Sequence, residues 1–169
     1  MPAASRPPEA FHPSQPEGAP MNRYARFAIM ILTSTVVMFG MMYLNTFEYD
    51  HVFFSETRAW MALMMGAAMA FIMLAFMLGM YTNRSANIAI FIGSIAVFCV
   101  SLWLVRSQAT VDEVSYMKAM IPHHSIAILT SSRARINDPR VRKLADGIIE
   151  TQRKEIAEMK GLVGELGKR

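Results

Sequence analysis

The sequence predicts an all-α fold in which three transmembrane helices precede an antiparallel hairpin of amphipathic helices. Two observations predict it. Three windows between Phe27 and Val105 contain no Asp, Glu, Lys or Arg, and from Thr110 onward apolar residues recur at helical spacing. A length of 169 residues ordinarily suffices for about one domain. We divide the chain into a disordered Pro-rich tail over residues 1–22, a three-helix transmembrane domain over 23–106 and an extracytoplasmic helical-hairpin domain over 107–169.

The charge-free windows are Phe27–Phe47, Ala59–Asn83 and Ser85–Val105. Each reaches the roughly 20 residues that a helix needs to cross about 30 Å of hydrocarbon. Buried helices of a soluble protein are the alternative, but three such runs in so short a chain leave too little polar surface to cover them. We therefore expect a multi-pass protein whose first partner is the lipid bilayer.

Basic residues near the spans predict the orientation. Arg23 and Arg26 precede the first span and Arg84 lies in the turn after the second, so the N-terminus and this turn are expected in the cytoplasm and the C-terminal domain outside. Arg106 and Lys118, after the third span, oppose this assignment. The N-terminal tail lacks the basic start and short apolar core of a signal peptide, so we expect the first span to remain as an anchor.

Composition excludes other classes of protein. The formal net charge is +4, but the C-terminal basic residues alternate with acidic ones and no stacking aromatics lie among them, which argues against nucleic-acid binding. Cys99 is the only cysteine, so an intrachain disulfide is excluded. His51, beside Asp50 in the loop after the first span, is interpreted as a solvated loop histidine rather than a metal ligand.

Small residues at four-residue spacing predict where the membrane helices pack. They are Ala62, Gly66 and Ala70 in the second span and Ala89 and Gly93 in the third. The second span is also rich in methionine, which raises the alternative of a copper conduit. A four-residue spacing drifts around a 3.6-residue helix, so these methionines do not line one pore, and we interpret the spans as a scaffold.

Two amphipathic helices are expected after the third span. Thr110 or Asp112 can cap the first, which should run to about Ile136. The sequence Asn137-Asp138-Pro139 then provides a stop, a new N-cap and a proline at the first helical position. The second helix should continue to about Leu166, with one apolar stripe of Val141, Leu144, Ala145, Ile148, Gln152, Ile156, Met159 and Val163.

Thioethers and imidazoles gather on the first of these helices, at Met117, Met120, His123 and His124. Such soft, uncharged donors suit copper, above all Cu(I). Adjacent helical residues point about 100° apart, so the two histidines cannot face one spot, and Met120 is expected between their directions.

Folding the hairpin at Asn137-Asp138 sets residues of the two helices level with one another. His123 should be level with Gln152, Met120 with Glu155, and Met117 with Glu158 and Met159, although Pro122 is expected to kink the first helix.

The same region resembles a known bacterial family, domain of unknown function 305. The resemblance covers roughly residues 110 to 165. It is carried by Glu113, Tyr116, Met120-Ile121-Pro122-His123-His124, Ala127-Ile128, Asp138-Pro139, Val141-Arg142, Leu144-Ala145, Ile148-Ile149, Gln152, Glu155-Ile156 and Met159. It implies a ferritin-like helical module, here a half-bundle, and a periplasmic role in copper binding, and it does not cover the membrane spans. From those spans we expect the protein in a bacterial inner membrane.

The resemblance implies metal ligands at His123, His124, Met120 and Met159, to which spacing adds Met117, with Gln152, Glu155 and Glu113 as supporting residues. Thr130 stands where the family commonly has a methionine, and this chain has one helix pair where many members have two. A lone pair of helices is near the lower limit for an independent core, so we expect a homodimer or packing against another protein.

These observations favour a binding protein over an enzyme. A ferritin-type iron oxidase places Glu-x-x-His motifs on its bundle helices and a zinc hydrolase uses a pair such as His-Glu-x-x-His, and the hairpin has neither. The first hypothesis is a membrane protein displaying a copper-binding helical module for sequestration, handover or sensing. The alternative is a metal-free membrane anchor whose hairpin recruits a partner protein.

Overall fold

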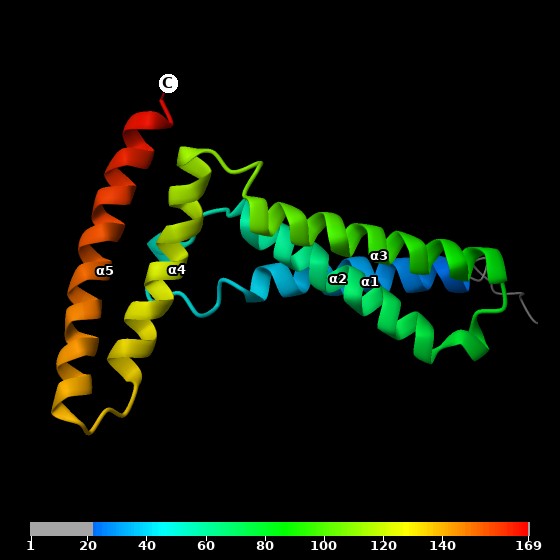
Figure 1. Ribbon diagram of the computed structural model, residues 1–169, viewed down its shortest axis with the longest axis horizontal. Helices are drawn as coiled ribbons and strands as arrows, with labels where there is room; N and C mark the ends of the chain where they lie inside the picture. The colour runs from blue at the N-terminus through cyan, green and yellow to red at the C-terminus, as the bar shows by residue number, and fades with distance from the viewer. Residues whose placement is uncertain (1–21, 169) are drawn as a thin grey trace, which may run out of the picture.

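The computed structural model describes residues 22–168, and within them it forms α-helices and short 3-10 turns without any strand. The elements are α1 (Arg23–Met41), η1 (Tyr49–His51), α2 (Glu56–Phe76), η2 (Leu78–Met80), α3 (Arg84–Ser107), α4 (Glu113–Arg133) and α5 (Pro139–Leu166). Helices α1 to α3 form an elongated bundle, and the α4–α5 hairpin crosses one end of it at a steep angle (Figure 1). The all-α prediction is confirmed.

Side-chain caps explain where the last two helices begin. The carboxylate of Asp112 accepts the N–H of Ser115 at 2.7 Å, and that of Asp138 accepts the N–H of Arg140 at 2.8 Å, directly before Pro139. Such N-caps satisfy amide donors that have no partner inside the helix. Both starts follow from the sequence, although α4 ends at Arg133 rather than at Ile136.

The three expected spans correspond to α1, α2 and α3, each long and apolar enough to cross a membrane. Their ends differ from the windows. Helix α1 stops at Met41 rather than Phe47, and α2 stops at Phe76, before the short η2 turn. A run without charged residues indicates that a segment transfers readily into lipid, but it does not show where the helix ends. An apolar loop residue such as Phe47 therefore extends the charge-free window beyond the end of α1.

Small residues bring α1 and α2 together. Ala62 and Gly66 are buried, and a Cβ atom added to Gly66 would collide with the Thr35 hydroxyl of α1. The packing face predicted for the second span is thus confirmed at these two positions. Ala89 and Gly93 of the third span are exposed, so they do not form a packing face among the described residues. Helix α3 instead buries the small polar residues Ser94 and Ser101.

Polar contacts tie the start of α1 to the turn between α2 and α3. Arg23 Nη1 donates to the carbonyl of Met80 at 3.1 Å, and the Tyr24 hydroxyl donates to Asn87 Oδ1 at 2.9 Å. Nearby, Phe27, Leu74 and Tyr81 form a buried cluster. The N-terminal end of α1 and the α2–α3 turn therefore share one end of the bundle. The predicted Pro-rich tail lies outside the described residues, apart from Asn22.

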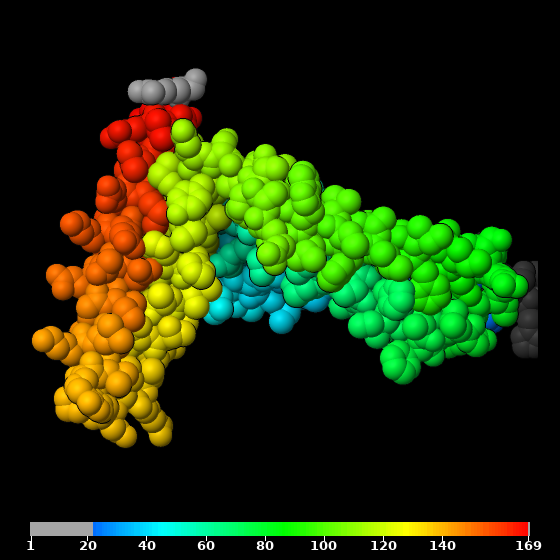
Figure 2. All heavy atoms as spheres, in the orientation of Figure 1, coloured from blue at the N-terminus to red at the C-terminus, as the bar shows by residue number. Residues whose placement is uncertain are grey.

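The hairpin lies against the opposite end. Its buried cluster consists of Ile121, Ile128 and Ile156, and two aromatic residues of the α1–α2 loop, Phe47 and Phe53, pack against it. Helix α4 faces the bundle and α5 lies on its outer side, as the space-filling view in Figure 2 shows. The core of the hairpin thus includes residues far from it in sequence.

Candidate metal centre

The two adjacent histidines of α4 point to different sides of the helix. Their ring centroids lie 6.2 Å apart, with the planes inclined at 55°. His124 lines a groove between α4 and α5, whereas His123 lines a second one between α4 and the start of α2. This divergence was expected from the rotation of about 100° per helical residue.

The groove between α4 and α5 collects most of the predicted donor residues. Met117 and His124 contribute from α4, and Glu155, Glu158 and Met159 contribute from α5. Met117 was predicted to lie at the same height in the hairpin as Glu158 and Met159, and the three residues do line the same groove. Other residues that line the groove are Gln108, Val111, Asp112, Glu113, Tyr116, Leu162 and Leu166.

Met120, expected between the two imidazole directions, lines only one of the two grooves. It lines the second groove with His123, among residues of α2 and the α1–α2 loop such as Arg58 and Met61. The structure thus separates Met117 and His124 from Met120 and His123. Helical spacing allowed Met120 to belong to either set, and only the packing of α4 against α2 decides it.

The imidazole of His124 has a buried nitrogen without a hydrogen bond in the described part of the chain. Its Nδ1 lies 3.2 Å from Oε2 of Glu155, close enough for an ion pair but not aligned as a hydrogen bond. Burial lowers the pKa of His124. The negative charge of Glu155 raises this pKa in part, and the neighbouring His123 lowers it further. The lowered pKa favours the neutral ring, the form that binds metal ions.

Neighbouring residues support this carboxylate. Gln152 Nε2 donates to Oε2 of Glu155 at 3.2 Å, so the amide orients the acid that faces His124. Glu113, in the first turn of α4, lines the same groove. Glu155 therefore lies beside His124 and is contacted by Gln152, whereas Glu113 lines the groove about three helical turns away from His124.

The helix pair that forms this groove also carries the family signature. Residues 113–169 match one protein-family model over α4, α5 and the turn between them. This segment belongs to the family Domain of unknown function (DUF305). The resemblance inferred from the sequence is confirmed for the segment.

One viral protein is also similar to part of this chain. Over 74 residues the chain is 39% identical to the Uncharacterized protein L153 of Acanthamoeba polyphaga mimivirus, a stretch that covers 43% of this chain. It covers 49% of that relative, so the match spans about half the relative's length. No solved structure gives a significant match.

A second polar cluster joins the DUF305 segment to the α1–α2 loop. His51 is buried, and its Nδ1 lies 3.0 Å from the hydroxyl oxygen of Ser125 on α4. The interpretation of His51 as a solvated loop residue is therefore wrong. The loop folds back onto α4, because the backbone N–H of Phe47 also donates to Ser125 Oγ, at 2.7 Å.

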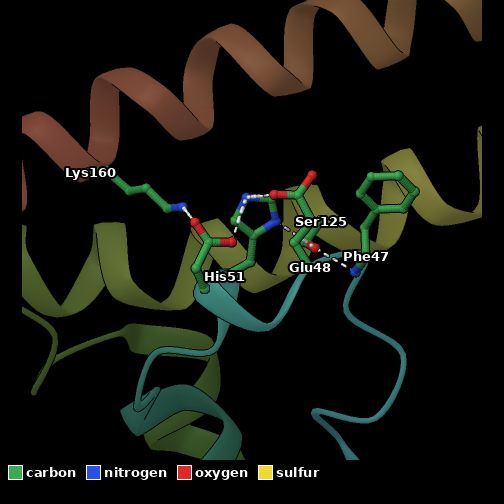
Figure 3. Close-up of polar contacts among 6 residues, drawn as sticks. Phe47, Glu48, His51, Ser125 and Lys160 are labelled. Atoms are coloured by element: carbon green, nitrogen blue, oxygen red, sulfur yellow. Dashed lines mark hydrogen bonds and ion pairs between the residues drawn. The ribbon is translucent and has the colours of Figure 1, made fainter.

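Two carboxylates accompany this histidine (Figure 3). Nε2 of His51 lies 3.7 Å from Oε2 of Glu48 and 3.7 Å from Oδ1 of Asp50. The other oxygen of Asp50 accepts a hydrogen bond from Lys160 of α5 at 2.5 Å, which lowers the pKa of Asp50. Burial and the positive charge of Lys160 lower the pKa of His51, whereas the two carboxylates act in the opposite direction and raise it. A sequence signal existed, since Glu48 and His51 have Glu-x-x-His spacing.

Proposed function

We propose that this protein is a membrane protein that binds copper as Cu(I) in the groove between α4 and α5. His124, Met117 and Met159 are the proposed ligands. One observation carries the proposal. The buried Nδ1 of His124 lacks a hydrogen bond among the described residues, and it lines the same groove as two thioethers. A buried nitrogen of this kind is costly unless it finds a partner, and a soft cation is the partner that this donor set favours.

The remaining predicted ligands play a different part in this proposal. His123 and Met120 face α2 and the loop, so they do not complete the same site. Glu155 adds a negative charge beside His124, which balances a bound cation, and Gln152 fixes its orientation. Copper is bound for sequestration, handover or sensing rather than for catalysis. We place the protein in a bacterial inner membrane, with the DUF305 segment in the periplasm.

The two faces of α4 provide a matched test. Cu(I) affinity should be measured on the full chain in detergent by anaerobic competition with a chromophoric chelator. Met117→Leu and His124→Gln should each lower the affinity by at least about tenfold, as expected when a site loses a supporting group. Met120→Leu and His123→Gln make the same chemical changes on the other face and should leave it unchanged. Equal effects on both faces would contradict this assignment of ligands.

The exposed face of α5 favours a second candidate function, a metal-free anchor that recruits a partner. Val141 and Leu144 of α5 are exposed. If none of the four variants changes copper retention, and the parent binds Cu(I) no better than a chain lacking both histidines, this second function is the better account.

A further inference from the structure

A second group of chemically active side chains lies outside the DUF305 segment, at η1 of the α1–α2 loop. A 3-10 turn has about three residues per turn, so residues three apart stand on the same side. Glu48, which precedes η1, and His51, which ends it, are three residues apart and come together for this reason. Asp50 completes a set of three ligand atoms that all lie within 4.8 Å of one another.

The imidazole of His51 is held with one nitrogen facing the acids. Its side chain is only 8% exposed, and Ser125 occupies Nδ1. Among residues 22–168, Nε2 makes no hydrogen bond, because both carboxylate oxygens are 3.7 Å away, beyond hydrogen-bonding distance. When Nδ1–H donates to Ser125 Oγ, the lone pair of Nε2 points between the carboxylates. Metal-binding histidines are commonly oriented in this way through their other nitrogen.

The two distances from Nε2 of His51 to the carboxylate oxygens are close to those around a bound metal ion. Bonds of about 2.0–2.2 Å from zinc to nitrogen and oxygen separate neighbouring donors by roughly 3.0–3.5 Å. The 3.7 Å separations need to contract by only a few tenths of an ångström. The side chains of Glu48 and Asp50 are 53% and 66% exposed, so they are free to make that rotation.

We propose that Glu48, Asp50 and His51 bind a divalent cation of the zinc class, with one oxygen from each acid and Nε2 of His51 as ligands. An imidazole with two carboxylates suits Zn²⁺ and related ions, whereas Cu(I) prefers thioethers and Mg²⁺ or Ca²⁺ prefer oxygen alone. The site is independent of the proposed copper groove, since it shares no ligand with it.

Lys160 determines which oxygen of Asp50 is available. It holds Oδ2, so Oδ1 remains for the ion. The ammonium repels a cation, which weakens binding, but it also links Asp50 to α5. A bound ion therefore joins the α1–α2 loop to the hairpin through Asp50 and Lys160 on one side and through His51 and Ser125 on the other.

The test is a Zn²⁺ titration of the full chain in detergent, read out by competition with a chromophoric chelator. Glu48→Gln is the informative variant because the acid is more than half exposed and, among the described residues, makes its ion pair with His51 alone. We expect it to lower the affinity for Zn²⁺ at least about tenfold. Glu150→Gln, an equal charge change on the exposed surface of α5, should not lower it.

Two further measurements separate this site from the copper groove. Met117→Leu should bind Zn²⁺ like the parent, and Glu48→Gln should bind Cu(I) like the parent. Co²⁺ added in place of Zn²⁺ should give a visible d–d spectrum that Glu48→Gln weakens. The proposal is overturned if the parent does not bind Zn²⁺, if Glu48→Gln and Asp50→Asn bind it unchanged, if Glu150→Gln weakens it equally, or if Met117→Leu abolishes it.

Discussion

The hydroxyl of Ser125 lies 3.0 Å from Nδ1 of His51, although 74 positions separate the two residues in the chain. The same oxygen accepts the backbone N–H of Phe47 at 2.7 Å. One fully buried hydroxyl on α4 thus contacts two points of the loop between α1 and α2. It connects the bundle to the hairpin directly.

Ser125→Ala should therefore destabilise the protein. The change leaves a backbone N–H and an imidazole nitrogen without partners in the interior, which costs about 1–3 kcal/mol per buried group. Denaturant unfolding in detergent measures the effect. Ser132→Ala is the control, because that exposed hydroxyl bonds only to the carbonyl of Leu129 in its own helix. Equal stability of the two variants would contradict the role of Ser125.

Gly66→Ala should weaken the packing of α1 on α2. The added Cβ meets the Thr35 side chain at a separation that real atoms do not adopt, and overpacking of this kind costs about 1–3 kcal/mol. Gly93→Ala, with nothing within 4 Å of its Cβ, should be neutral or stabilising. Adding Thr35→Ala to Gly66→Ala should recover part of the loss. Unfolding midpoints of the four proteins check this.

The N-cap of α5 should make hairpin stability depend on pH in the acid range. Hydrogen bonds from Arg140, first from its side chain and then from its backbone, lower the pKa of Asp138 below 3.8. A carboxyl group whose pKa is lower in the folded than in the unfolded state stabilises the folded protein at pH values above the unfolded-state pKa. This contribution to stability is lost as the pH falls through the pKa of the carboxyl group in the folded state.

Asp138→Asn tests this, since asparagine caps helices but does not titrate. Between pH 5 and pH 2.5, the helical circular dichroism and unfolding midpoint of Asp138→Asn should fall less than those of the parent. Asp138→Ala should be less stable at every pH. A parent and an Asn variant with identical pH profiles would exclude the effect.

Membrane topology should follow the basic residues at the start of α1. Reporter fusions at Arg84 are expected to give a cytoplasmic signal, and fusions at Arg169 an external one. The structure adds an internal check, because Arg23 contacts the η2 turn that precedes Arg84. A cytoplasmic Arg169 fusion would rule out a periplasmic copper role.

The exposed apolar stripe of α5 should drive self-association. Leu144 is 65% exposed and Val141 48% exposed, and complete burial of such a side chain is worth roughly 1.5–3 kcal/mol. Leu144→Ser should shift the full chain in detergent toward a monomer in sedimentation experiments. Ala157→Ser changes an exposed position of the same helix and should not. A monomeric parent at high micromolar concentration would refute the homodimer.

Local chemistry explains which parts of the fold could be predicted. The starts of α4 and α5 depend on Asp112, Asp138 and Pro139, which act on the backbone next to them, so the sequence shows them directly. The separation of His123 from His124 follows from helical rotation. The partner of Met120 does not, because α2 supplies that groove from some 60 residues away.

The loop shows the limit most clearly. A histidine between two acids in a polar loop has the composition of a solvated segment. Only the long-range contacts of His51 with Ser125 and of Asp50 with Lys160 bury or fix these residues. Long-range pairing of this kind leaves no periodic signal. The Glu-x-x-His spacing of Glu48 and His51 was the one local indication.

The packing of Phe47 and Phe53 into the hairpin core has a consequence for biosynthesis. The loop leaves the ribosome well before α4 and α5, and both parts must reach the same side of the membrane before they can meet. For helices that can span a membrane, as α2 and α3 can, insertion of one without the other would leave a lipid bilayer between Phe47 and Ile121. A chain in which only one of these two helices inserts therefore cannot complete the hairpin core, and Ile121, Ile128 and Ile156 lose their contacts with Phe47 and Phe53.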